Sequence, residues 1–292
     1  KVLYKSIEIL TWASSNLQIE ENLPFLQLYN TLVESCLNTL FFLQKSVKKI
    51  TIIQALKQSL VALTFSIFTP NKIGDYAAKT IYFSASKKPQ IIFLNFLNNM
   101  GQLFSTCLFG IVGLTLFFIK YNVNISHQSI SRLLFITIFS ILLIMFILKY
   151  GKSQIMSRKL KNIIDLNKHI SKTIHINNIM FSVIRYLIFS FQFYVLLVLV
   201  NVNLSYFEAM IPIASIYLLS SVVPTIVLFD FAVKGSIALY IFKIVGINEI
   251  TTISIITLMW ILNVVIPTLI GSYFILNFNF AQLVNSSKNI TV

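Results

Sequence analysis

Two short segments, one in each half of the chain, place a carboxylate and an amine at the spacing of one helical turn. They are Asp75-Tyr76-Ala77-Ala78-Lys79 and Asp230-Phe231-Ala232-Val233-Lys234, and each follows a proline, Pro70 or Pro224. Residues four apart lie on the same face of a helix, where an acid and a lysine attract each other. The carboxylates can receive an ammonium group and the lysines a phosphate, so these residue types indicate a charged headgroup as the ligand.

The backbone before the first pair is interrupted by Pro70 and by Gly74. Such interruptions are expected to leave free N–H groups at the start of a short helix, where the helix dipole favours an anion such as phosphate. The simpler interpretation of each pair is a surface ion pair worth a few tenths of a kcal/mol. Ionisable groups within a membrane, however, cost roughly 2.5 to 3.5 kcal/mol each on insertion scales and usually serve a function.

Further polar side chains lie within long apolar segments. Arg185 and Gln192 are two helical turns apart and share one helix face, from which Arg185 can reach a lipid phosphate or the membrane interface. We expect Asn99 to form an interhelical hydrogen bond, and the glycines at 101, 110 and 113 to allow close helix packing. The residues that we predict to bind substrate are Pro70, Gly74, Asp75, Lys79, Gln102, Arg185, Gln192, Pro224, Asp230 and Lys234.

The composition indicates that membrane helices position these residues. Hydrophobic residues make up 57% of the 292-residue chain and charged residues 11%, against roughly a quarter charged in an ordinary globular domain. The net charge of +14 lies mostly between apolar segments, which favours anionic lipid headgroups over nucleic acid as neighbours. The two cysteines and three histidines show no spacing typical of metal or catalytic motifs. We therefore expect no metal, no cofactor and no enzymatic activity.

A membrane-spanning helix requires about 20 apolar residues. On this basis we predict an all-α fold, a single polytopic transmembrane helical bundle over 1–292 with about seven spans. The predicted spans are 23–43, 51–69, 91–119, 133–148, 179–200, 207–229 and 250–276. The segments 70–83 and 232–245 are too short to cross, and we expect them to return as re-entrant half-helices. Residues 1–22 are predicted to form an interfacial helix or a partial first span.

The basic segment 149–178 determines the predicted orientation, because the positive-inside rule places it on the cytoplasmic face. Following the chain in both directions from this segment puts the two half-helices on opposite faces of the membrane. The repeat units, around 51–119 and 207–276, are therefore predicted to be inverted. Inverted repeats with broken helices are typical of many secondary transporters, in which half-helix ends point at the substrate.

Four segments resemble the flippase-like transmembrane region of the lysylphosphatidylglycerol synthase family and of its stand-alone bacterial members. They are Phe68-Thr-Pro-Asn-Lys-Ile-Gly-Asp-Tyr76, Ser182-Val-Ile-Arg-Tyr-Leu-Ile-Phe-Ser-Phe-Gln192, Pro224 through Gly235, and Trp260-Ile-Leu-Asn-Val-Val-Ile-Pro-Thr-Leu-Ile-Gly271. The resemblance covers the chain from about Tyr29 onward. In this family the acid of the motif is commonly Glu and the base Arg, whereas this chain has Asp and Lys at both sites.

The resemblance implies a multi-pass protein of the bacterial inner membrane that moves or presents lipids between leaflets, without the synthetic activity of the synthases. We predict a lipid translocase that binds a phospholipid or lipid-linked headgroup between the two half-helix units, and the sequence is compatible with an oligomer. Two alternatives remain open. One is an intramembrane transferase acting on lipid phosphates, and the other is a non-transporting accessory subunit whose basic segment binds a partner or anionic lipid.

Overall fold

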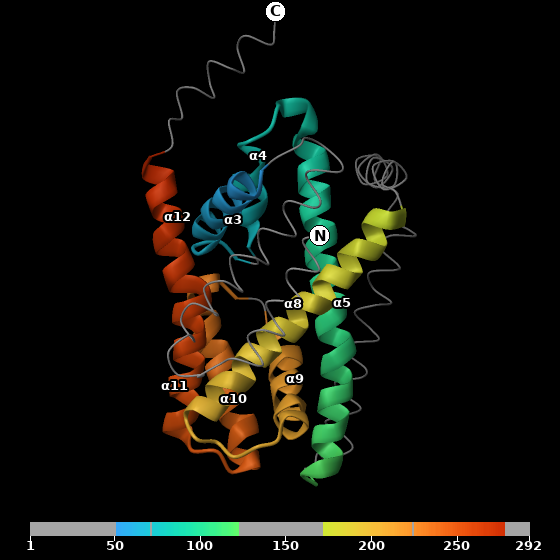
Figure 1. Ribbon diagram of the computed structural model, residues 1–292, viewed down its shortest axis with the longest axis vertical. Helices are drawn as coiled ribbons and strands as arrows, with labels where there is room; N and C mark the ends of the chain where they lie inside the picture. The colour runs from blue at the N-terminus through green and yellow to red at the C-terminus, as the bar shows by residue number, and fades with distance from the viewer. Residues whose placement is uncertain (1–50, 71, 123–171, 224, 278–292) are drawn as a thin grey trace, which may run out of the picture.

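The computed structural model describes residues 51–70, 72–122, 172–223 and 225–277 (Figure 1). Regular secondary structure in this part of the chain is helical apart from one isolated β-bridge, which confirms the all-helical class. In order, the elements are α3 (Ile52–Ser66), α4 (Ile73–Thr80), η1 (Ala85–Lys87), α5 (Lys88–Lys120), α8 (Lys172–Leu199), α9 (Tyr206–Val222), η2 (Val227–Phe229), α10 (Asp230–Val245), α11 (Glu249–Trp260), η3 (Ile261–Val265) and α12 (Ile266–Leu276).

Several predicted elements lie outside the described residues. These are the first segment at 1–22, the spans at 23–43 and 133–148, residues 149–171 of the basic connection, and Pro224.

Three helices are long and apolar enough to cross a membrane: Ala85–Lys120, Lys172–Leu199 and Glu249–Leu276. They confirm the long apolar helices predicted at 91–119, 179–200 and 250–276. The shortest of them has 28 residues, or about 42 Å of helix, against about 30 Å of hydrocarbon. The length and composition of these helices support a multi-pass membrane protein.

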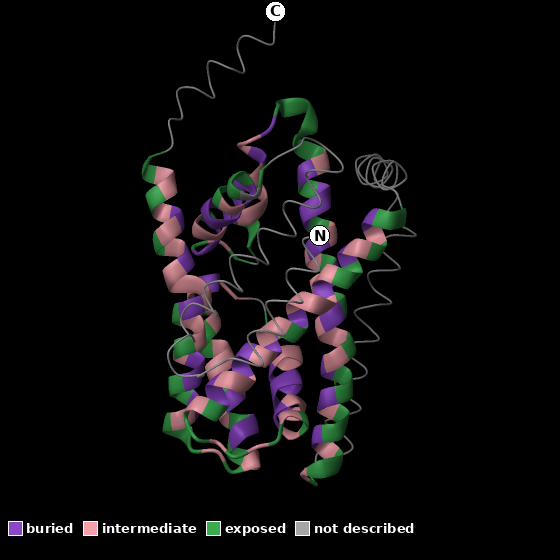
Figure 2. Ribbon diagram, viewed as in Figure 1, coloured by how far each residue is buried: buried purple, intermediate pink, exposed green. Residues whose placement is uncertain are grey.

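Exposed apolar side chains follow the lower part of α5 (Figure 2). Leu108, Val112, Leu116 and Ile119 are all exposed, and they are spaced three or four residues apart on one side of the helix. In water a continuous apolar stripe of this kind would be a site of association. In a bilayer the same stripe matches the acyl chains.

Two of the predicted full spans are shorter than expected. Helix α3 has 15 residues and α9 has 17, which correspond to about 22 and 26 Å, against about 30 Å of hydrocarbon. The cause at the end of α9 is local: Val223 has extended dihedrals, φ −90° and ψ 113°, because a residue that precedes proline is displaced from the helical region. The helices at 51–69 and 207–229 therefore end before the predicted boundaries.

The boundary of the basic connection also differs from the prediction. Helix α8 begins at Lys172, so residues 172–178 belong to a helix rather than to the polar connection predicted over 149–178. The polar residue at the end of this stretch is held by packing, since the side-chain amide of Asn178 donates a hydrogen bond of 2.8 Å to the Leu97 carbonyl of α5. A polar side chain at a helix surface therefore does not by itself mark a solvent-exposed connection.

Helices α3 and α4 form a hairpin in the upper half of the molecule as drawn in Figure 1. The two helices approach closely at Gly74: a Cβ built there would lie 2.1 Å from the carbonyl oxygen of Phe65. Only glycine allows this approach. The turn is held by Thr69, whose hydroxyl accepts a 2.8 Å hydrogen bond from the Gly74 N–H.

Helices α9 and α10 form a second hairpin in the lower half of the molecule (Figure 1). The ends of the two hairpins meet, because Pro70 and Ile226 form an antiparallel β-bridge. A second backbone contact joins them, with Leu228 N–H donating to the Ile67 carbonyl at 3.3 Å. The two turns therefore lie together, partway along the length of the three long helices.

Small residues allow α5 to pack against its neighbours. A Cβ at Gly113 would lie 2.5 Å from the Ala214 side chain of α9, and one at Gly110 would lie 2.5 Å from Leu218. A Cβ at Gly101 would lie 2.6 Å from the Ser182 hydroxyl of α8. These approaches confirm the packing role predicted for the three glycines.

The third long helix contains a π-helical turn, η3, between α11 and α12. Before this turn α11 packs against α10, and after it α12 packs against α3 (Figure 1). The contact with α3 is close, since a Cβ at Gly271 would lie 2.4 Å from the Leu60 carbonyl. Each half of this helix therefore supports a different hairpin.

Two ion pairs stabilise the lower end of the bundle. Lys120, at the end of α5, lies 2.7 Å from Glu208 in the first turn of α9. Hydrogen bonds from Lys120 and from Ser205 lower the pKa of Glu208 to about 2. Lys243 of α10 lies 3.2 Å from Glu249 of α11. Lysine charge at this end is therefore balanced by glutamate.

Candidate functional site

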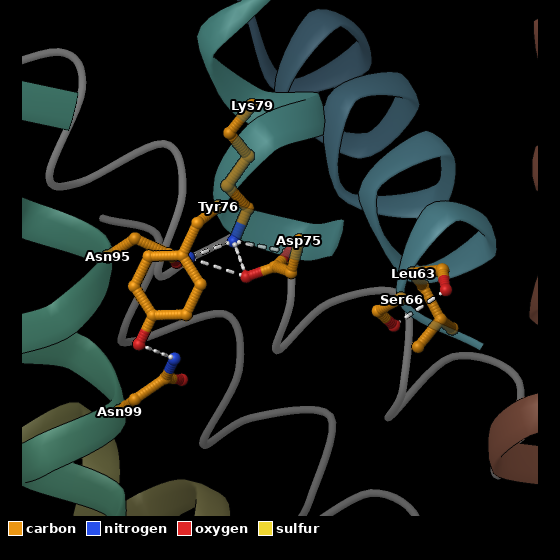
Figure 3. A network of polar contacts seen from close by, with 7 residues as sticks. All are labelled: Leu63, Ser66, Asp75, Tyr76, Lys79, Asn95 and Asn99. Carbon is orange, nitrogen blue, oxygen red and sulfur yellow. Dashed lines mark hydrogen bonds and ion pairs between the residues drawn. The ribbon is translucent and has the colours of Figure 1, made fainter. Parts of the chain in front are cut away.

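The first acid–lysine pair forms an ion pair that also includes an amide from the next helix. On α4, the Lys79 Nζ lies 3.0 Å from the Asp75 Oδ1, and both side chains are mostly buried, with exposed fractions of 13% and 16%. Asn95 of α5 contacts both partners (Figure 3): it accepts from Lys79 Nζ at 2.8 Å and donates to Asp75 Oδ2 at 2.6 Å. A buried pair needs such further hydrogen bonds to offset desolvation.

A neighbouring contact fixes α4 on α5. The Asn99 side-chain amide donates a 2.7 Å hydrogen bond to the Tyr76 hydroxyl (Figure 3), which confirms the interhelical hydrogen bond predicted for Asn99. Asn95 and Asn99 are one helical turn apart on α5, so one polar strip of this helix holds Asp75, Tyr76 and Lys79 of α4.

The second pair, Asp230 and Lys234, forms an ion pair in the first turns of α10. It is more accessible than the first, with 39% of the lysine and 27% of the aspartate side chain exposed. The Thr225 hydroxyl donates to Asp230 Oδ1 at 3.4 Å. The two pairs thus share their spacing and their internal pairing but differ in burial and in neighbours.

Lys72 brings the two pairs into one electrostatic environment. It lies at the turn between α3 and α4 and has left-handed dihedrals, φ 58° and ψ 31°. The residue is exposed in the described structure. The charges of Arg185, Lys234, Asp230 and Asp75 all act on its ammonium group. Lys72 therefore lies within electrostatic reach of both aspartates.

We call the six charged residues at this place the tip cluster, because they gather where the turns of the two hairpins meet. The tip cluster consists of Lys72, Asp75, Lys79, Arg185, Asp230 and Lys234. It draws on both hairpins and on one long helix.

Two predicted residues from the long helices meet near the tip cluster. Arg185 of α8 donates from Nε to Gln102 Oε1 of α5 at 2.6 Å. This contact orients the guanidinium, since Nε is one of its donors. The structure thus gives Gln102 the role of holding Arg185.

Gln192 lies buried on α8, and the backbone at Gly74 differs from the prediction. Gln192 is buried, and its amide atoms have no hydrogen-bond partner in the described part of the chain, while Phe193 beside it in the sequence belongs to the apolar core. At Gly74 the N–H is bonded to Thr69, and the Asp75 N–H is bonded to the Lys72 carbonyl at 3.0 Å. The amides that we expected to be free for an anion are engaged within the hairpin.

Sequence reasoning missed Lys72 and Asn95. Lys72 lies between Pro70 and Asp75 in the same short motif, so its position next to the predicted pair was a usable signal. Asn95 belongs to a series of amides on an apolar helix, with Asn99 and Gln102, and a polar strip on a membrane helix indicates a polar neighbour.

The described residues contain no group of three or more His, Cys, Asp or Glu side chains that could hold a metal ion. Comparisons of the chain with models of protein families, with curated proteins and with solved structures found no match.

Proposed function

We propose that this protein is a lipid translocase of the flippase-like type, which binds the headgroup of a phospholipid or lipid-linked substrate at the tip cluster. The observation that carries the proposal is the position of the tip cluster. Charged side chains from two hairpins meet partway along helices that are long enough to span a membrane. Ionisable groups at that depth are costly and usually serve a function, which includes forming the pathway of a substrate.

In this proposal the hairpins α3–α4 and α9–α10 are re-entrant and enter the bilayer from opposite faces as an inverted repeat. Helices of 15 and 17 residues that turn back before crossing are consistent with this arrangement. The two turns would separate the aqueous spaces on either side, and rocking of one repeat against the other would expose the tip cluster to each leaflet in turn. The acyl chains would remain in the bilayer.

The orientation follows from the charges at the two ends of the bundle. Lys87, Lys88 and Lys172 lie at the upper end in Figure 1, whereas the lysines of the lower end are paired with Glu208 and Glu249. By the positive-inside rule the upper end faces the cytoplasm, where it would contact anionic headgroups. We place the protein in the inner membrane of a bacterium, in line with the resemblance of its sequence.

The test is movement of a fluorescent lipid across vesicles that contain the full-length protein. Wild-type protein should carry nitrobenzoxadiazole-labelled phosphatidylglycerol to the outer leaflet, where dithionite reduces the dye. Asp75→Asn and Lys234→Ala should slow this movement about tenfold, because each removes a charged contact worth about 1.5 to 3 kcal/mol.

Matched controls come from the lower end of the same bundle. Glu249→Gln and Lys243→Ala remove the same charges from an exposed pair, and they should leave the rate unchanged. Failure of the wild-type protein to move lipid, or equal rates in wild type and both tip-cluster variants, would refute the proposal.

A further inference from the structure

Helices α5 and α8 pack against each other through small and polar residues (Figure 1). Gly101 of α5 allows the approach, since a Cβ there would lie 2.6 Å from the Ser182 Oγ of α8 and 2.9 Å from the Asn178 Nδ2. The Asn178 amide also donates a 2.8 Å hydrogen bond to the Leu97 carbonyl of α5. The side chains of Asn178 and Ser182 therefore lie against one turn of α5, residues 97–101.

Three polar side chains on these two helices are buried and carry an oxygen atom that no described residue satisfies. Asn98, Asn178 and Ser182 have exposed fractions of 8%, 5% and 0%. Their side-chain oxygens, Oδ1 of each asparagine and Oγ of the serine, have no hydrogen-bond partner within the described ranges of the chain. A buried polar atom without a partner costs free energy, so these oxygens call for a ligand that supplies hydrogen bonds.

Asn98 lies between two contacts of α5 with α8. One turn before it, Leu94 packs in a cluster with Ile174 of α8, and one turn after it Gly101 meets Ser182. Residues 94, 98 and 101 share one face of the helix, because they are spaced four and three apart. Asn98 is therefore on the face of α5 that packs against α8, in the same turn that Asn178 and Ser182 contact.

The unpaired atoms match the hydrogen-bonding groups of one water molecule. The two amide oxygens only accept hydrogen bonds, whereas the Ser182 hydroxyl can donate one. A water molecule that donates to both amides and accepts from the hydroxyl makes three hydrogen bonds, the usual number for a buried water. None of the three side chains is acidic, so a neutral ligand suits them better than a cation, whose charge would be buried without a counter-charge.

We infer that α5 and α8 hold an internal water molecule, bound by Asn98, Asn178 and Ser182. This site is separate from the proposed headgroup site and does not depend on lipid movement. Asn98 and Ser182 each follow the first residue of their helix by ten positions, or about 15 Å of helix. The water therefore lies well inside the two long helices, where it replaces a direct contact between their polar side chains.

The water site adjoins a contact of the candidate functional site. Gln102 directly follows Gly101 on α5, and Arg185 follows Ser182 by three residues, about one helical turn, on α8. A water that ties the two helices together at Ser182 fixes how far one is shifted along the other. It thereby helps to hold the alignment at which Arg185 reaches Gln102, 2.6 Å away.

The first test is a density map of the full-length protein in lipid nanodiscs, detailed enough to show ordered water. A peak should lie at hydrogen-bonding distance, about 2.7 to 3.2 Å, from the Ser182 Oγ and from both amide oxygens. A map that shows ordered water elsewhere inside the bundle and none at these three atoms would overturn the inference.

Two substitutions give opposite signs for a hydrated and a dry contact. Asn98→Leu and Ser182→Ala each remove one of the unpaired oxygens with little change in size. At a hydrated contact each should lower the melting temperature by about 2 °C or more, because the water loses a partner. At a dry contact each should raise it, because a costly unpaired atom is gone. A rise or no change in both variants would contradict a bound water.

The matched control is Ser190→Ala. Ser190 is a buried serine of the same helix, but its hydroxyl already donates to the Tyr186 carbonyl at 2.9 Å. A serine bonded back to its own helix contributes little to stability, so this variant should melt within about 1 °C of wild type. A loss at Ser190 as large as that at Ser182 would remove the evidence for water from the substitutions.

A double variant tests whether the two helices share one ligand. Asn98→Leu combined with Ser182→Ala should lose less than the sum of the two single losses, because both atoms bond the same water. Additive losses would refute a shared ligand. Exchange of choline chloride for sodium chloride should leave the wild-type melting temperature unchanged. A rise in sodium that Asn98→Leu abolishes would identify a cation at the site and overturn the assignment of water.

Discussion

Asn95 is the residue that converts an ordinary helix-surface ion pair into a fixed structure. A lysine and an aspartate four residues apart contribute only a few tenths of a kcal/mol at an exposed helix surface. Here the Asn95 amide bonds both Asp75 and Lys79 and is itself buried. Hydrogen bonds to charged groups contribute more to stability than those between neutral groups. When a buried charged group loses such a bond, the free-energy cost of its desolvation is no longer offset.

We therefore expect Asn95→Ala to destabilise the protein by about 2 to 3 kcal/mol. The measurement is reversible unfolding in detergent. Asn99→Ala is the matched variant, because Asn99 makes a single neutral hydrogen bond to Tyr76, and it should cost only about 1 kcal/mol. A smaller effect at Asn95 than at Asn99 would show that the amide bridge contributes little.

At the scale of the elements, the feature that decides the architecture is the hairpin turn. The chain reverses direction between α3 and α4, and the two helices approach closely where Gly74 lies against the backbone carbonyl of Phe65. Helix α10 contains a glycine directly after its acid–lysine pair, Gly235, where a methyl group would fit without a clash. A Cβ at Gly235 would lie 3.8 Å from the Ile256 side chain, which is an ordinary contact.

The two glycines should respond oppositely to alanine. Gly74→Ala places a methyl group against backbone, so α3 and α4 must separate, and we expect a loss of about 2 kcal/mol or more. Gly235→Ala should be neutral or stabilising by up to about 1 kcal/mol, because alanine loses less entropy than glycine in a helix. Melting temperatures of the two variants check both signs, and a well-folded Gly74→Ala protein would contradict the close packing of this hairpin.

The sequence predicted the existence of these elements better than their lengths. The long helices α5, α8 and α11–α12 were predictable because an apolar run of more than 20 residues is typical of a membrane-spanning helix. The ends of α3 and α9 were not, since apolar residues continue through both turns, as at Phe68 and Phe229. The contact between Pro70 and Ile226 joins segments from opposite halves of the chain, and no local pattern encodes such a partner.

At the scale of the whole molecule, the difference in charge between the two ends of the described bundle predicts its orientation in the membrane. The upper end carries Lys87 and Lys88 on the turn before α5. The lower end carries lysines that are paired with glutamates. Net positive charge at one end favours that end in the cytoplasm.

Cysteine labelling in intact cells tests this orientation. In a protein whose native Cys36 and Cys107 are replaced by serine, Ser86→Cys lies on the exposed turn at the upper end and Asn203→Cys on the exposed turn at the lower end. A membrane-impermeant maleimide should label position 203 and reach position 86 only after the cells are opened. The reverse pattern would invert the orientation.

The π-helical turn between α11 and α12 has a mechanical consequence for the molecule. A π turn weakens the regular hydrogen bonding of a helix and is a common place for bending. Since α11 packs on the lower hairpin and α12 on the upper, this turn allows each half of one helix to follow its own hairpin when that hairpin shifts. The joint at Ile261–Val265 thus gives the helix a bending point between the half that supports the lower hairpin and the half that supports the upper one.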